Sequence, residues 1–224
     1  MLRMILVCGL LATTSTVHAQ TAPSPAEIAA YDGLHRAAQN GNVDEINRLA
    51  KAGAPLDGRD RNGRTPAHVA AFAAQAGALR ALARAGADMN ALDAQAYDVV
   101  TIAAVADNPE LMSLAIELGN DPGLTTSPYR GTALIAAAHL GHVEVVRRLI
   151  AAGAPLDHVN NLGWTALMEA VVLGDGGPNH RQVVRLLVEA GADRSIADRD
   201  GVTPLAHARA RGYTEIASLL EKGR

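Results

Sequence analysis

This sequence has little cysteine, few aromatic residues and no excess of positive charge. Its one cysteine, Cys8, excludes a disulfide framework and a cysteine-based zinc site. With only 3% aromatic residues in 224, the core must consist of small and aliphatic side chains, which favours closely packed helices. The net charge of -3 gives no global attraction to nucleic acid or to an anionic membrane, and we expect neither as a partner.

The usual catalytic motifs are missing as well. The sequence contains no glycine-rich phosphate loop, no nucleophile elbow, no HExxH and no paired cysteines. We therefore predict a protein that is not an enzyme, with no catalytic residues, no cofactor and no bound metal.

The first 19 residues have the features of a secretory signal peptide. Arg3 precedes an apolar run over residues 4–12, and the sequence VHA at residues 17–19 is a small-x-small pattern suited to signal peptidase. The run is too short to span a bilayer. A lipoprotein signal would have its cysteine at the end of the run, whereas Cys8 lies in the middle. We predict export, in a bacterium to the periplasm, and no membrane attachment after cleavage.

A period of about 33 residues organises the rest of the chain. One position recurs in the same local context at 32, 65, 98, 132, 165 and 203, with steps of 33, 33, 34, 33 and 38. A glycine follows 21 residues later at 53, 86, 119 and 153, and 26 residues later at 191, within the longest step. Two independent features at one fixed spacing predict stacked repeats with one continuous core, and hence a single domain.

Each repeat carries the signals of two helices. Thr65 and Thr203 can cap a helix N-terminus, and each is followed by a proline at the first helical position. The second helix has its apolar residues at helical spacing, and Gly153 is typical of a helix end in the left-handed conformation. Residues 60–63 (DRNG) and 198–201 (DRDG) favour tight turns. The predicted fold class is all-α with short β-hairpin turns.

These residues resemble the ankyrin repeat, most closely from Thr132 to Ala192, where GTAL, GHVEVVRRL and AGA follow the family pattern. The resemblance implies a solenoid of about six repeats over residues 32–224. A short linker and N-terminal capping helix over residues 20–31 precede it, opened by a capping-box pattern at Ser24 and Glu27. The third repeat departs most from the family pattern, and the fifth has a five-residue insertion.

Two further features of the repeats have structural and functional interpretations. The resemblance implies that His35 and His68 bridge neighbouring repeats, and that His142, the family's turn histidine, is structural as well. The insertion, within residues 174–179, is expected to be an extended loop between two helices. It is either a tolerated surface insertion or a recognition loop, since solenoid insertions gather on particular faces.

The resemblance also implies that partners bind along a concave surface of hairpin tips and inner-helix ends. Aromatic residues and arginine dominate the binding energy of protein interfaces, which favours such residues on this surface as binding residues. The structural alternatives are that Phe72 fills the core and that Trp164 packs on a neighbouring hairpin. Residues 59–64 form a local basic patch, either a solvated turn or a surface for an acidic partner. The predicted partner-binding positions on hairpins and helix ends are Arg59, Arg61, Asn62, Arg64, Phe72, Tyr129, Arg130, His139, Asn161, Leu162, Trp164, Leu173, Arg199 and Arg211.

One polar position on the inner helices is unusual. Glu169 and His207 occupy equivalent places in adjacent repeats, four residues after the capping threonine. A buried carboxylate and imidazole are costly unless paired, which favours a hydrogen-bonded structural pair. The alternative is a polar spot in the binding groove, with His139 or His180 nearby.

These features favour a non-enzymatic, monomeric interaction module of the bacterial cell envelope that binds an unidentified partner protein through its concave face. The alternatives are an envelope enzyme or metal-dependent small-molecule binder that uses Glu169, His139 and His207, and a purely structural spacer.

Overall fold

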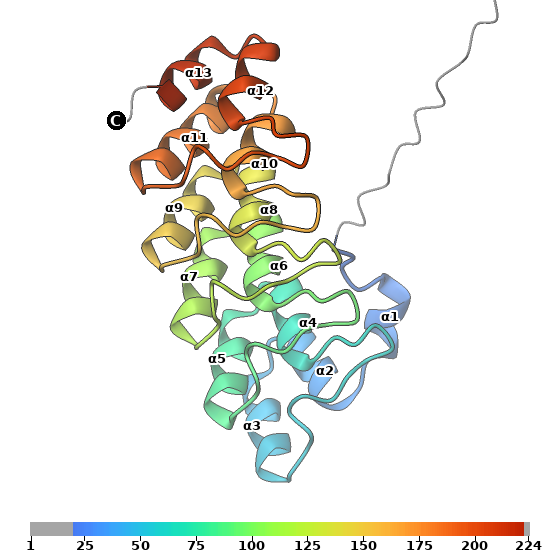
Figure 1. Ribbon diagram of the computed structural model, residues 1–224. Coiled ribbons are helices and arrows are strands. Elements are labelled where there is room, and N and C mark those ends of the chain that lie inside the picture. Colours follow the sequence, from blue (N-terminus) through green and yellow to red (C-terminus); the bar gives the residue numbers. More distant parts are fainter. Residues whose placement is uncertain (1–19, 222–224) are drawn as a thin grey trace, which may run out of the picture.

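A computed structural model describes residues 20–221, so the predicted signal peptide lies outside the described residues. The described chain forms thirteen helices that stack into a curved, elongated solenoid (Figure 1). The helices are α1 (Pro25–Ala30), α2 (Gly33–Gln39), α3 (Val43–Lys51), α4 (Pro66–Phe72), α5 (Ala76–Ala85), α6 (Val99–Val105), α7 (Pro109–Glu117), α8 (Ala133–Leu140), α9 (Val143–Ala151), α10 (Ala166–Val172), α11 (Pro178–Glu189), α12 (Pro204–Ala210) and α13 (Thr214–Glu221).

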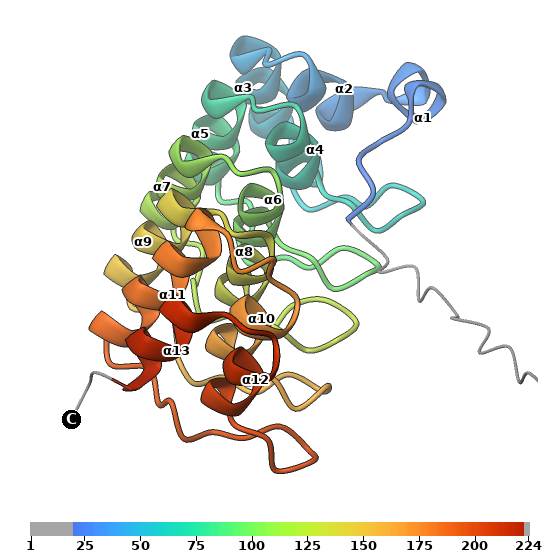
Figure 2. The same ribbon diagram turned by 90° about the horizontal axis from the view of Figure 1, so that it is seen from above.

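Six helix pairs follow α1, one for each predicted repeat. The first helices of the pairs (α2, α4, α6, α8, α10, α12) pack side by side in an inner row, and the second helices form an outer row. The loops between pairs project from the inner row on one side of the molecule (Figure 2). The predicted all-α solenoid is confirmed. Over residues 20–221, none of these helices combines the length and the apolar character needed to cross a bilayer.

Alanine sets the close spacing of the inner row. Ala38, Ala70, Ala104, Ala138 and Ala170 are fully buried in successive inner helices. Because their side chains are small, neighbouring helices approach closely and the core fills without large aromatic residues. This packing explains how a chain so poor in aromatics builds a continuous core.

The helix ends follow the predicted chemistry. Asp98 Oδ1 accepts a hydrogen bond from the Thr101 backbone N–H at 2.8 Å, and Thr132 and Thr165 cap α8 and α10 in the same way. After α9 the chain reverses at Gly153, whose φ of 81° is a left-handed conformation that glycine adopts without a Cβ clash. Local sequence therefore determines where each helix begins and ends.

The hairpin tips share one hydrogen-bonding pattern. Asp60 Oδ1 accepts from the backbone N–H groups two and four residues later, at 2.8 and 2.9 Å. Asp93, Asn160 and Asp198 make the same pair of hydrogen bonds. In the divergent third repeat Ala96 has a φ of 60°, where the second, fifth and sixth hairpins have a glycine. The divergent sequence therefore still forms the turn.

Successive hairpin tips are joined to one another. The backbone N–H of Asn161 donates to the Tyr129 carbonyl at 2.9 Å, and equivalent bonds join the second tip to the third and the third to the fourth. Among residues 20–221, one isolated antiparallel bridge, between Thr126 and Gly131, is present. The predicted β-hairpins are therefore tight turns with very little strand pairing.

Helix α1 lies outside both rows (Figure 2), and its segment contacts the hairpin of the second repeat. Ser24 and Glu27 form the predicted capping box. The Tyr31 hydroxyl donates to Asp60 Oδ2 at 2.9 Å, and an Arg64 guanidinium nitrogen lies 2.6 Å from Glu27 Oε1. These contacts hold the segment before the first repeat against the hairpin of the second repeat, 29 to 37 residues further along the chain.

The insertion in the fifth repeat is divided between a loop and a helix. Helix α11 begins at Pro178 and has 12 residues, whereas α9 has 9. The predicted loop over residues 174–179 is therefore too long, because Pro178 fits the first turn of a helix and starts α11. Asp175 Oδ1 accepts from the Gly177 N–H at 2.7 Å and lies 2.8 Å from His180 Nδ1. The loop is thus held by its own hydrogen bonds.

Candidate partner-binding site

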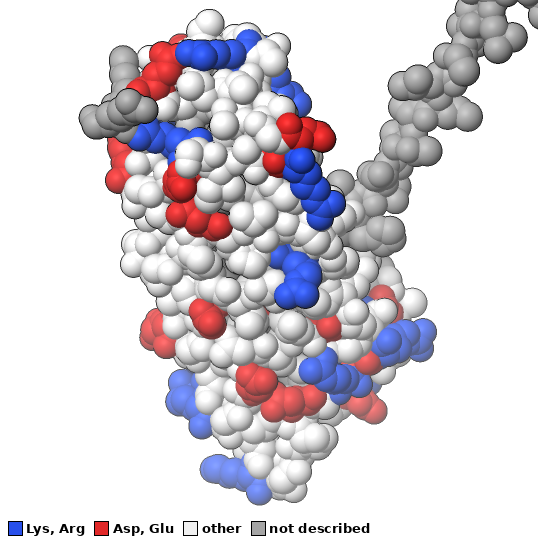
Figure 3. Space-filling model, viewed as in Figure 1, with Lys and Arg blue, Asp and Glu red and all other residues white. Residues whose placement is uncertain are grey.

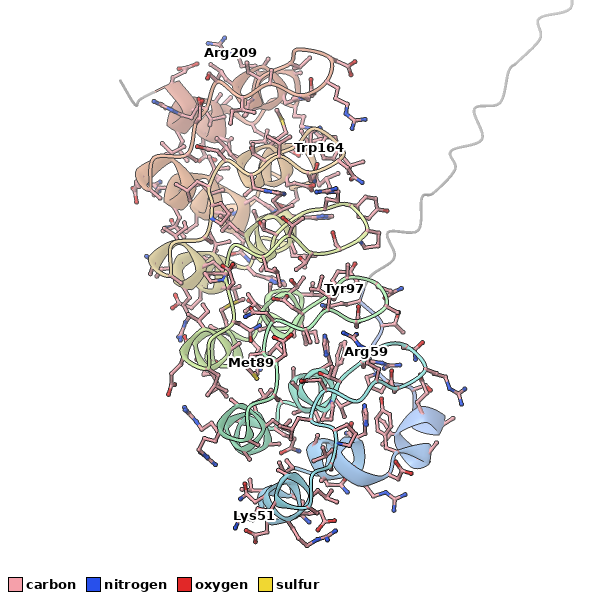
Figure 4. All side chains as sticks on the ribbon, turned by 60° about the horizontal axis from the view of Figure 1, so that its bottom comes forward. Lys51, Arg59, Met89, Tyr97, Trp164 and Arg209 are labelled. Carbon is pink, nitrogen blue, oxygen red and sulfur yellow. The ribbon has the colours of Figure 1, made fainter. Side chains whose placement is uncertain are left out.

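A groove of about 400 Å³ lies on the hairpin side of the third, fourth and fifth repeats. Residues of α6, α8 and α10 and of the hairpins that precede them line it, together with Gln20, which precedes α1. Figure 4 shows Tyr97 and Trp164 on hairpin loops of the same side of the solenoid. The large side chains that line the groove are Tyr97, Tyr129, Ile135, Leu140, Leu162, Trp164 and Leu173.

Three leucines of this groove are unusually exposed. The exposed fractions are 43% for Leu140, 40% for Leu162 and 43% for Leu173. They line the same groove as Trp164 and Tyr129, residue types that are enriched at the centres of protein interfaces. A contiguous exposed apolar surface on a soluble protein marks a binding site more often than isolated apolar residues do. The groove is therefore the best candidate site on the described residues.

A buried acid lies in the groove. Glu169 is only 4% exposed, and its Oε1 accepts a hydrogen bond from Asn160 Nδ2 at 2.9 Å. Its Oε2 receives no hydrogen bond from any described residue and lies 3.5 Å from His139 Nδ1. One oxygen of the carboxyl group is therefore satisfied, and the other is buried without a hydrogen-bond donor from the described residues.

The environment disfavours charge on both groups. Burial raises the pKa of Glu169 from 4.5 to about 7, against the opposing effect of the Asn160 hydrogen bond. Burial also lowers the pKa of His139, and the nearby imidazole of His180 lowers it further. At neutral pH His139 is therefore an uncharged imidazole, and it does not neutralise a Glu169 carboxylate.

Six of the predicted binding residues meet in this groove. They come from the fourth and fifth repeats, and the stacking of α8 on α10 brings them together. The residues are Tyr129, His139, Leu162, Trp164, Glu169 and Leu173.

The predicted pairing of Glu169 with His207 is wrong. His207 Nε2 lies 2.6 Å from Asp198 Oδ2, and Glu169 bonds to Asn160. In each case the partner lies nine residues earlier, in the hairpin of the same repeat. Side chains at this position of the inner helix reach back to their own hairpin and do not meet across repeats. The constellation of Glu169, His139 and His207 therefore does not assemble.

The sequence predicted that Arg64 belongs to an exposed basic patch, and the structure shows that it does not. Arg64 is only 2% exposed, and nitrogens of its guanidinium lie 2.6 Å from Glu27 Oε1 and 3.1 Å from Asp60 Oδ2. The prediction failed because α1 packs against this hairpin. Arg59 and Arg61 remain exposed, beside a second hollow of about 520 Å³ that α1 and this hairpin enclose.

The other predicted positions lie outside the groove. Arg130, Asn161 and Arg199 are exposed on hairpin tips, where charged side chains are scattered over the face in Figure 3. Phe72 is partly buried against the core, in agreement with its structural interpretation. Asn62 is exposed on the second hairpin, and Arg211 is exposed at the end of α12, with its guanidinium carbon 5.9 Å from the centre of the Tyr213 ring.

The bridging role implied for His35 and His68 is visible in the structure, and His142 also contacts a neighbouring repeat. His35 Nε2 lies 2.9 Å from the Arg64 carbonyl oxygen, and His68 Nε2 lies 2.9 Å from that of Tyr97. His142 Nδ1 lies 2.8 Å from the Ala104 carbonyl oxygen. Each histidine therefore joins two repeats and is occupied structurally.

Sequence reasoning missed several residues of the groove, among them Tyr97, Leu140 and Asn160. Leu140 occupies the same place at the end of α8 that Leu173 occupies after α10, so this helix end could have been included. Asn160 could have been found from its place in the hairpin, which Asp60 and Asp198 share. No group of three or more potential metal ligands lies together among residues 20–221.

Comparisons with known proteins agree on one family. The family model described as ankyrin repeats matches residues 10–93 and 100–197. The ankyrin repeat protein YahD of Escherichia coli (strain K12) is 35% identical over 185 residues, which are 82% of this chain and 92% of YahD.

Solved structures show the same fold. An ankyrin repeat domain from Acinetobacter baumannii AYE superposes with a TM-score of 0.78 at 46% identity, over 84% of this chain and 95% of that chain. The ankyrin repeat protein EF0377 gives a TM-score of 0.78 at 31% identity, over 87% of this chain and 100% of that chain. A third match comes from the complex of the predatory endopeptidase Bd0816 of Bdellovibrio bacteriovorus with the immunity protein Bd3460. One chain of that complex superposes with a TM-score of 0.70 at 20% identity, over 87% of this chain and 99% of that chain.

Proposed function

The chain belongs to the ankyrin-repeat family, whose members are in general non-enzymatic protein–protein interaction modules, and we propose that it binds a partner protein, as a monomer, with the groove over α6, α8 and α10. The observation that carries this proposal is the cluster of exposed leucines beside Tyr129 and Trp164. Inner helices and linked hairpin tips hold these side chains on a rigid frame, so that little conformational entropy is lost when a partner binds.

A solved complex of an endopeptidase with an immunity protein shows one setting in which this fold is found. One chain of that complex shares the fold of this protein, although at 20% identity the likeness concerns the fold alone. A partner of the present chain would be an enzyme that it inhibits or stabilises, or an incoming toxin. The groove offers such a partner a largely apolar lining whose one acid among the described residues is Glu169.

An affinity capture experiment tests the proposal. The immobilised protein is exposed to an envelope extract of the source organism, and bound proteins are identified by mass spectrometry. We expect a protein that binds the wild type and is lost from the double variant Trp164→Ala, Tyr129→Ala. Val159→Ala is the matched control, because Val159 is 46% exposed and does not line the groove. A partner that binds all three proteins equally would contradict the proposed site.

We also propose that the protein works in the bacterial cell envelope, in the periplasm. The support is the signal-peptide pattern over residues 1–19, which also contains the only cysteine of the chain. A fusion of residues 1–25 to a reporter that is active only outside the cytoplasm should be active. A silent fusion, made at normal levels, would place the protein inside the cell.

A further inference from the structure

The groove contains an acid, Glu169, that has no lysine or arginine partner among residues 20–221. Glu169 Oε2 receives no hydrogen bond from the described residues, and no lysine or arginine lines the groove. A buried carboxylate is costly unless a charge or hydrogen-bond donors compensate it. Because the described side chains supply one hydrogen bond, from Asn160 to Oε1, and no lysine or arginine, a cation from outside is the ligand that Oε2 is best suited to receive.

The single unpartnered oxygen of Glu169, Oε2, indicates which type of cation binds best. Oε1 already accepts from Asn160, so a single oxygen is left. A guanidinium binds best to both oxygens of a carboxylate as a two-pronged pair, whereas an ammonium is a compact charge that needs one. His139, 3.5 Å from Oε2, is uncharged near neutral pH and offers a second acceptor for an ammonium proton. The geometry therefore favours a primary ammonium.

The walls of the groove suit the rest of such a ligand. The side chains of Ile135, Leu140 and Leu173 give the groove apolar lining for an aliphatic stem, and the aromatic residues Tyr97 and Trp164 line it as well. A lysine has a four-carbon stem that buries along apolar surface and an ammonium that is attracted to aromatic rings. Acid, aromatic rings and aliphatic side chains are the complement of one lysine side chain.

We propose that the groove binds a lysine side chain of the partner protein, with its ammonium on Glu169 Oε2 and His139 and its stem against Leu140 and Leu173. This inference rests on the proposed function, because it names the partner residue that enters the same groove. It predicts that the partner presents a protruding lysine on its contact surface.

The test uses n-butylammonium, which reproduces the lysine stem and its charge. Trp164 is the only tryptophan of the chain, so its indole N–H gives one assignable NMR signal inside the groove. The full chain is titrated at pH 8, where the Glu169 carboxylate is ionised. We expect a saturable shift of this signal, with at least tenfold weaker binding of n-butanol and weaker binding of n-butylguanidinium.

Variants assign the effect to the acid. Glu169→Gln keeps the shape of the side chain and the acceptor for Asn160, and should bind n-butylammonium at least tenfold more weakly than the wild type. The matched control is Glu117→Gln, whose side chain is 60% exposed on α7 and outside the groove, and should bind as the wild type does. The circular dichroism of each variant verifies that it is folded.

Three results would overturn the inference. They are the absence of a saturable shift in the wild type, equal binding by Glu169→Gln, and binding of butanol or butylguanidinium as tight as that of butylammonium. The affinity capture separates this failure from that of the proposed function. If Trp164→Ala, Tyr129→Ala loses the partner while Glu169→Gln retains it, the groove remains the binding site and the lysine is excluded.

Discussion

Replacing Glu169 with glutamine should stabilise the free protein at pH 8 and have little effect at pH 5. Glu169 is almost fully buried, with one oxygen bonded to Asn160 and the other without a donor among the described residues. Ionising this group in the folded protein is therefore unfavourable. The neutral amide of glutamine keeps the acceptor for Asn160 and removes the charge.

The sign and size of the effect follow from the pKa of Glu169. Burial raises it from 4.5 to about 7, so the unfolded chain ionises at lower pH than the folded protein does. The wild type then loses stability as the pH rises from about 4.5 to about 7, and the full loss is present above 7. A separation of this size corresponds to about 3 kcal/mol at pH 8 and to less than about 1 kcal/mol at pH 5.

Urea unfolding of the wild type and Glu169→Gln at both pH values measures the difference. Circular dichroism follows the helices, and Trp164 fluorescence follows the fifth repeat, which contains both Trp164 and Glu169. Glu117→Gln is the control, because this exposed acid pairs with Arg80 on the surface and should change stability little at either pH. A gain for Glu169→Gln that is absent at pH 8, or equal at the two pH values, would refute the reasoning.

Two further substitutions test the packing around the second hairpin. Arg64→Ala removes a buried guanidinium from two acidic partners and should lower the free energy of unfolding in urea by about 3 kcal/mol. The control Arg61→Ala, at an exposed arginine, should lower it by under about 0.5 kcal/mol. Equal losses in the two variants would contradict the burial of the ion pair. Gly63→Ala would bring a Cβ to 2.6 Å from the Ala94 nitrogen and should be destabilised by at least about 1 kcal/mol more than Gly53→Ala, which has a similar φ and open space around it. Similar melting temperatures for these two glycine variants would show that the hairpins do not press on one another.

Much of the fold could be predicted because its signals are local. The capping residue, the proline after it and the glycine at the helix end act within one or two turns of the chain, and the structure has helices where they predicted them. The third repeat, whose sequence diverges, forms the same turn because Asp93 supplies the two side-chain hydrogen bonds and Ala96 accepts the left-handed conformation.

The site could be predicted only in part, because side-chain direction and tertiary contacts decide it. The period places Glu169 and His207 at equivalent positions, but their side chains turn toward their own hairpins. The capping box predicts α1, yet nothing local indicates that this helix covers Arg64. The aromatic and apolar residues at helix ends and hairpins were a better guide, and Tyr129, Trp164 and Leu173 do meet in one groove.

The most direct test of the account is amide hydrogen exchange of the protein with and without its captured partner. If the groove binds the partner, protection should appear at the C-terminal ends of α8 and α10 and in the hairpin residues 127–131 and 160–164, which border it. The outer helices α9 and α11 should exchange as they do in the free protein. Protection confined to the outer helices, or to α1 and the second hairpin, would contradict the claim that this groove is the binding site.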